Sequence, residues 1–154
     1  MIISFSTKYL ISTIIFSLFV IFAANAQAVP PREKICGRWE SANNTLIITI
    51  SLVKNEYKAV IDWFSDTEGK PLDYWKDRHN PDPKLRNRKI HGLSILRGLN
   101  YHADTKSWED GMIYDSKHGK EWNASAYIDD QGLLRVKGYW HFKFIGRTMK
   151  FKRI

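Results

Sequence analysis

The sequence predicts an all-β protein: one antiparallel up-and-down barrel of about eight strands with a long charged loop. Two observations lead to this prediction. Apolar and polar residues alternate along most of the chain, and turn-forming residues separate these stretches roughly every 8–12 residues. In addition, no segment after residue 28 shows a convincing helical period. Short strands at this spacing are typical of antiparallel barrels and sandwiches.

Before the first predicted strand, residues 1–28 have the three-part pattern of a secretory signal peptide. Lys8 is the only charged residue before Arg32, and an apolar run from Tyr9 to Ala24 leads into small residues. The alternative is an uncleaved membrane anchor, but the apolar run is shorter than the roughly 20 residues that a spanning helix needs.

Cleavage after Ala26 or Ala28 would leave residues 29–154 as a single exported domain, in the periplasm or outside the cell. Loss of Lys8 leaves 23 basic and 16 acidic residues, a net charge of +7. Export argues against nucleic acid as a partner, so lipid headgroups, anionic glycans and acidic metabolites are the available polyanions. Cys36 is the only cysteine, which excludes an intrachain disulfide.

The first two strands with clear alternation are Thr45–Val53 and Tyr57–Phe64, and Asn43-Asn44 before them suits a tight turn. In the first strand, one face carries Leu46, Ile48, Ile50 and Leu52. In the second, one face carries Tyr57, Ala59, Ile61 and Trp63. These faces are expected to line the core.

The C-terminal half continues this scheme with four more strands. We expect them at Ser107–Tyr114, Lys120–Ile128, Leu133–Trp140 and Arg147–Ile154. Between them, Asp115–Gly119 and Asp129–Gly132 are turn sequences.

Between the two halves, Leu72–Arg88 is crowded with charges and prolines, which exclude a central strand. We expect a long loop with one helical turn at residues 83–86. Such a loop is either a solvated basic segment or a lid that meets an acidic partner. Its candidate contact residues are Asn80, Asp82, Arg86 and Arg88.

A Gly37-Arg-Trp39 triplet at the start of the domain and Arg153 near its end resemble the pair that closes lipocalin-like barrels. In that arrangement the indole closes one end and the guanidinium lies over its face.

The wider motif order resembles the bacterial secreted family catalogued as domain of unknown function 2147. The segments that carry the resemblance are Asn80–Arg88, Gly92–Leu99, Trp108–Asp115, Gly119-Lys120, Leu134–Tyr139 and Gly146–Thr148. The resemblance runs from about Cys36 to Ile154 and implies a signal peptide followed by one lipocalin-like barrel, with no established activity. The sequence departs from the pattern at Ser116, Trp122, Lys137 and Phe151, where proline, tyrosine, arginine and tryptophan are expected.

Our first functional hypothesis is non-catalytic binding of a small hydrophobic or amphipathic ligand, and the basic charge of the protein favours an anionic one. An eight-stranded barrel is wide enough to be filled by side chains or to hold one ligand, and the alternation does not distinguish the two. The candidate ligand-binding residues are Tyr114, Trp122, Arg135, Tyr139 and Arg147.

The alternative is a filled barrel that acts through its surface, with the basic segment Lys76–Lys89 contacting an envelope protein, a glycan or lipid headgroups. An enzyme is not expected. The five histidines form no metal-ligand pattern, no Gly-x-Ser-x-Gly elbow occurs, and nothing in the sequence indicates a cofactor.

Overall fold

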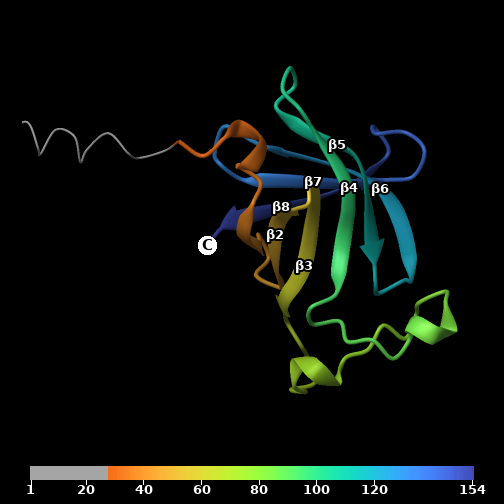
Figure 1. Ribbon diagram of the computed structural model, residues 1–154. Helices are drawn as coiled ribbons and strands as arrows, with labels where there is room; N and C mark the ends of the chain where they lie inside the picture. The colour runs from red at the N-terminus through yellow and green to blue at the C-terminus, as the bar shows by residue number, and fades with distance from the viewer. Residues whose placement is uncertain (1–27) are drawn as a thin grey trace, which may run out of the picture.

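A computed structural model describes residues 28–154, whose strands form a closed eight-stranded barrel (Figure 1). The strands are β1 (Gly37–Ser41), β2 (Leu46–Val53), β3 (Glu56–Phe64), β4 (Ser94–His102), β5 (Ser107–Asp115), β6 (Lys120–Ile128), β7 (Leu134–Tyr139) and β8 (Gly146–Arg153). Each strand pairs antiparallel with its chain neighbour, and β8 returns to β1. The predicted all-β antiparallel barrel is therefore confirmed.

The predicted signal peptide lies outside the described residues, apart from Ala28. Within residues 28–154, no helix is long and apolar enough to cross a membrane. The helical segments there are three short 3₁₀ turns, η2 (Pro31–Glu33), η3 (Leu72–Tyr74) and η4 (Pro83–Leu85). The last of these falls where a helical turn was predicted.

The predicted orientation of one residue in β3, Trp63, was wrong. Trp63 was expected beside Ile61, but the register shifts between Ile47 and Ile48, so that Ile61 pairs with Ile48 and Trp63 with Ile47. Paired residues share a face of the sheet, so this bulge moves Trp63 to the outer face, where it is 38% exposed. Ile61 stays buried inside.

The inner faces of the strands fill much of the barrel with large side chains. Trp39, Trp108 and Leu134 are among those that are at most 2% exposed. The same apolar cluster includes Ile48, Ile50, Tyr57, Ala59, Leu96, Leu99, Ala124, Ala126, Val136 and Phe151. This burial is the main source of stability of such a domain.

One end of the barrel is closed around Trp39. Its Nε1 donates a hydrogen bond to the carbonyl of Ile35 at 2.8 Å, and the Arg153 guanidinium lies 4.2 Å from the ring centroid. The same guanidinium donates to the carbonyl of Cys36 at 2.8 Å, so it bridges the first and last strands. The side chain of Arg153 also occupies the space into which a Cβ on Gly37 would project.

The turn η2 covers this closed end. The carbonyl of Arg32 accepts hydrogen bonds from the Tyr57 hydroxyl at 2.7 Å and from Trp108 Nε1 at 3.1 Å. The two rings meet edge to face, with centroids 6.4 Å apart. The polar atoms of these aromatic residues are thus satisfied by one backbone oxygen.

Candidate functional site at the open end of the barrel

The long loop between β3 and β4, residues 65–93, is anchored by a buried carboxylate. Asp77 is fully buried and accepts hydrogen bonds from Arg88 Nε at 2.8 Å, the Tyr114 hydroxyl at 2.7 Å and Asn80 Nδ2 at 2.8 Å. Because Tyr114 belongs to β5, this cluster ties the loop to the barrel. Burial raises the pKa of Tyr114, and its bond to Asp77 raises it further.

The other predicted loop residues hold the shape of the loop itself. Asp82 accepts from the Lys84 amide at 2.9 Å and caps η4, while Arg86 Nε donates to the Asn80 carbonyl at 2.8 Å. The Arg88 guanidinium also lies 5.3 Å from the Tyr114 ring centroid. Their polar groups are thus largely occupied by contacts within the loop and with β5.

A close approach fixes the loop against the turn between β5 and β6. A Cβ on Gly119 would lie 1.8 Å from the carbonyl oxygen of His79, and Gly119 has a φ of +64°. Both the contact and the backbone conformation require glycine there.

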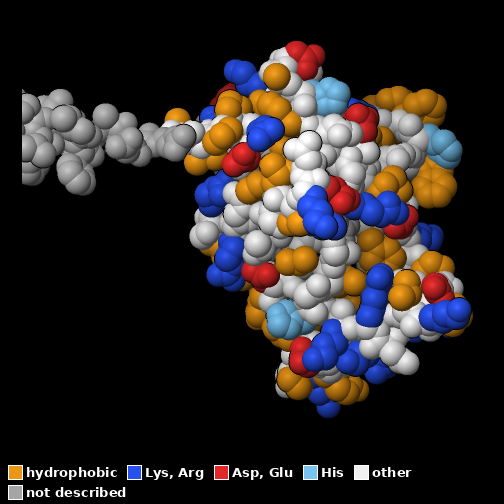
Figure 2. Space-filling view, in the orientation of Figure 1, with side chains coloured by type: hydrophobic (Ala, Val, Ile, Leu, Met, Phe, Trp, Pro, Cys, Tyr) orange, Lys and Arg blue, Asp and Glu red, His pale blue; other side chains and the backbone are white. Residues whose placement is uncertain are grey.

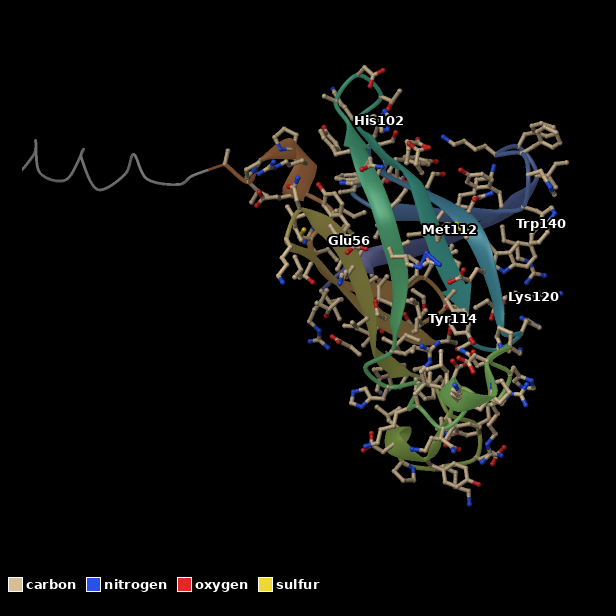
Figure 3. The ribbon with its side chains drawn as sticks, turned by 45° about the vertical axis from the view of Figure 1, so that its right-hand side comes forward. Glu56, His102, Met112, Tyr114, Lys120 and Trp140 are labelled. Atoms are coloured by element: carbon tan, nitrogen blue, oxygen red, sulfur yellow. The ribbon has the colours of Figure 1, made fainter. Side chains whose placement is uncertain are left out.

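A cavity of about 410 Å³ lies between this loop and strands β4 to β6. Its lining includes Leu85, Arg88, Ile95, Arg97, Met112 and Glu121. Met112 and Tyr114 mark this wall in Figure 3. Both arginines have acidic partners: Arg97 Nη2 contacts the two Glu121 oxygens at 2.7 and 2.8 Å, and Arg88 is bound to Asp77. Positive charge in this cavity is therefore largely compensated.

A second region lies inside the barrel, at the end opposite Trp39. A Cβ on Gly138 would contact Ile113 at 3.5 Å and Trp122 at 3.8 Å, so this face of β7 points inward. Arg147 of β8 pairs with Gly138 and therefore belongs to the same inward face. By the two-residue repeat of a strand, Met149 belongs to it as well.

This end of the barrel is open along β8. The β1–β8 register pairs Trp39 with Arg153, Glu40 with Lys152, and Ser41 with Phe151. It does not extend to the first half of β8. Accordingly, Met149 is 41% exposed and Arg147 is exposed, although both are on the inward face. Solvent therefore reaches the inner wall here, and we call this region the open end.

Arg147 is the uncompensated charge at the open end. None of the ion pairs formed among residues 28–154 involves Arg147. Its inward-facing neighbours Ile113 and Trp122 are apolar and half-buried. An exposed guanidinium beside apolar side chains is suited to a ligand with an anionic head and an apolar tail.

The model of a family described as "Uncharacterized protein conserved in bacteria (DUF2147)" matches residues 37–153. The chain belongs to the DUF2147 family. This DUF2147 chain is also similar to a solved structure, described as "Protein HP1028 from the human pathogen Helicobacter pylori belongs to the lipocalin family". The TM-score is 0.65 at 24% identity, over 78% of this chain and 82% of that one, which shows a lipocalin-like fold. Among curated proteins, no relative matches the sequence.

Of the five predicted ligand-binding residues, the DUF2147 barrel brings Trp122 and Arg147 together at the open end. The other three lie elsewhere. Tyr114 is held by the loop, and Arg135 Nε donates to Asp129 Oδ2 at 2.7 Å. Tyr139, which is adjacent to Gly138 and so on the opposite face of β7, is 8% exposed.

The connection between β7 and β8 in this DUF2147 protein carries large residues that sequence reasoning missed. Trp140, Phe142, Phe144 and Ile145 are all exposed, and the Trp140 ring meets Trp122 edge to face at 5.6 Å. A run of aromatic residues at a turn rather than in a strand was the signal that could have identified them. Within residues 28–154, no group of three or more His, Cys, Asp or Glu side chains is arranged to hold a metal ion.

Proposed function

We propose that this DUF2147 protein is an exported, non-catalytic binding protein for a small amphipathic anion, which binds at the open end of the barrel. The observation that carries the proposal is Arg147, an exposed cation on an inward face with no ion-pair partner among the described residues. The predicted signal sequence supports the exported location.

The chemistry of the open end matches such a ligand in two parts. The Arg147 guanidinium offers a planar pair of donors that suits a carboxylate or phosphate. Apolar surface on Ile113, Trp122 and Met149 offers contact for a hydrocarbon chain, worth about 25 cal/mol per Å² of buried apolar area. The loop cavity offers a weaker case, because Arg88 and Arg97 there are paired with acids.

The fold supports the same class of function. A lipocalin-like barrel of eight strands has room for one small ligand. Here the half around Trp39 is filled by apolar side chains, so the ligand occupies the opposite half and its tail remains short or partly outside.

The alternative function, docking through the basic loop, has less support. Arg88 and Lys89 form ion pairs with Asp77 and Asp73, and Arg86 donates to a loop carbonyl. These contacts engage three of the six lysines and arginines in Lys76–Lys89, including both arginines predicted as contact residues, Arg86 and Arg88.

The test compares dodecanoate with dodecanol by isothermal titration calorimetry. Arg147→Met should weaken dodecanoate binding by about tenfold or more while sparing dodecanol, because only the acid uses the guanidinium. Lys150→Met is the matched control, since Lys150 is an exposed cation on the opposite face of the same strand, and it should bind both compounds like the parent.

A second control separates the two candidate sites. Met112→Trp adds bulk to the lining of the loop cavity and should leave dodecanoate affinity unchanged. Loss of binding in Met112→Trp with normal binding in Arg147→Met would place the ligand in the loop cavity and refute the proposed site. Equal losses for acid and alcohol in Arg147→Met would refute the role of the guanidinium.

A further inference from the structure

The connection between β7 and β8 exposes a cluster of large apolar side chains to solvent. We call residues 140–145 the aromatic tip. Its four large apolar side chains have exposed fractions of 59% for Trp140, 60% for Phe142, 79% for Phe144 and 61% for Ile145. The tip lies at the upper right of Figure 1, and hydrophobic side chains gather at the same place in Figure 2. Contiguous apolar patches of this kind mark interaction sites.

The aromatic tip has a defined shape. Phe142 and Phe144 stack with centroids 5.4 Å apart and planes at 24°, and the Ile145 amide donates to the Phe142 carbonyl at 3.0 Å. Lys143, between them, forms an ion pair with Glu109 of β5. The tip is thus held against the barrel with its rings directed to solvent, so little ordering is needed when a partner binds.

The chain around the tip is strongly basic. Residues 133–154 contain seven lysines and arginines and no acidic residue. Three of these cations pair with acids elsewhere, namely Arg135, Lys143 and Lys152. The other four form no ion pair among residues 28–154: Arg153 lies over the Trp39 ring, and the remaining three are Lys137, Arg147 and Lys150. The tip therefore projects from a hairpin with uncompensated positive charge.

We propose that the aromatic tip docks on the surface of an anionic phospholipid bilayer. Its rings and Ile145 enter the boundary between headgroups and acyl chains, and the unpaired cations of the hairpin contact the headgroups. Aromatic side chains favour that boundary because they have a large apolar body and tolerate its partial hydration. Each nearby cation adds attraction to an anionic leaflet.

The positive charge of the hairpin favours an anionic bilayer, rather than a second copy of this chain, as the partner of the aromatic tip. A symmetric dimer through the tip would bring two basic hairpins together, and like charges across an interface oppose association. An anionic surface has the opposite charge. The proposal does not depend on ligand binding at the open end, although Trp140 contacts Trp122 there, so docking would bring the open end close to the lipid.

The test uses the protein recovered from the envelope fraction of a bacterial host, with its N-terminus established by intact mass. Parent and variants are compared in the same form. Co-sedimentation is measured with vesicles of phosphatidylglycerol and phosphatidylcholine, and with phosphatidylcholine alone. We expect binding to the anionic vesicles, weakened by added salt, and an affinity lowered about tenfold or more in Phe142→Ser/Phe144→Ser.

The matched control is Val53→Ser/Tyr127→Ser, which removes two apolar side chains that are 43% and 48% exposed elsewhere on the barrel. It should bind vesicles like the parent. Hydrogen exchange of the parent gives a readout that needs no variant, because anionic vesicles should protect the peptide that contains residues 140–147.

Unchanged vesicle binding in the tip variant would overturn the proposal, as would an absence of protection at residues 140–147. Sedimentation velocity in the absence of lipid checks the other occupant. A parent dimer that Phe142→Ser/Phe144→Ser dissociates would show that the tip binds a second copy, and would also overturn it.

Discussion

Replacing Trp39 should reveal how much of the stability depends on the closed end of the barrel. Trp39 is 1% exposed, donates to Ile35 and lies under the guanidinium of Arg153. Trp39→Ala leaves a cavity and removes all these contacts, so we expect the free energy of unfolding to fall by about 3–5 kcal/mol. Domains of this size are stable by roughly 5–15 kcal/mol in total. The variant should therefore lose a large part of its stability.

Further variants divide this loss into its parts. Trp39→Phe keeps a ring in the core but removes the N–H donor to Ile35, and should lower the free energy of unfolding by about 1–2 kcal/mol. A double-mutant cycle of Trp39→Leu with Arg153→Met, in which Leu removes the ring and Met removes the guanidinium, should give a coupling of about 0.5–1 kcal/mol.

The assay is urea unfolding followed by far-ultraviolet circular dichroism, with the slope on denaturant compared between variants. An equal slope shows that the same surface is exposed on unfolding, so that midpoint differences report stability. A Trp39→Ala variant within about 1 kcal/mol of the parent would refute the packing argument. Zero coupling in the cycle would refute an energetic role for the ring and guanidinium pair.

Two other predictions concern Asp77, which anchors the long loop, and Glu109, which forms an ion pair with Lys143 of the aromatic tip. Asp77→Ala leaves the donors around that fully buried carboxylate without an acceptor. We therefore expect the free energy of unfolding in urea to fall by about 2–4 kcal/mol, and proteolysis within residues 76–89 to become faster. Proteolysis at the rate of the parent would argue against Asp77 as the anchor of the loop. Burial raises the pKa of Glu109, but hydrogen bonds from Lys143 and Ser107 outweigh it and the pKa is lowered. Its stabilisation is therefore present above the unfolded pKa of about 4.3 and is lost as the pH falls through the folded pKa. Glu109→Gln should reduce the acid dependence of the melting temperature below about pH 4.3, and an unchanged profile would contradict this assignment.

Alternation in the sequence predicted most strands of this DUF2147 barrel well, because inward and outward residues differ in polarity wherever one face is buried. Both limits of Lys120–Ile128 agree with the structure, and every other predicted limit agrees or differs by one residue. β4 was not predicted. Gly98, with a φ of +73°, interrupts its alternation, and Asp110 on the neighbouring strand also has a positive φ, of 62°. Such irregularities displace side chains between faces without a clear sign in the composition.

The candidate site was less predictable, because it depends on which strand edges remain unpaired. Arg135 and Arg147 are both arginines near the C-terminus and look equivalent in sequence. Only the folded chain shows that Arg135 contacts Asp129, whereas Arg147 lies beyond the three residue pairs that join β1 to β8. The loop residues were recognised as a group, but their contacts around Asp77 required the structure.

The join between β1 and β8 also bears on how the chain folds. Its contacts link residues far apart in the sequence: the hydrogen bond from Arg153 to the Cys36 carbonyl spans 117 positions. Closing so long a loop has a large entropic cost that hairpin contacts do not share, so contacts of this kind slow folding. The strand hairpins are therefore expected to form early and the closure late. Until β8 is in place, the edge of β1 and the apolar interior stay exposed, and the unclosed barrel is the species most prone to aggregation.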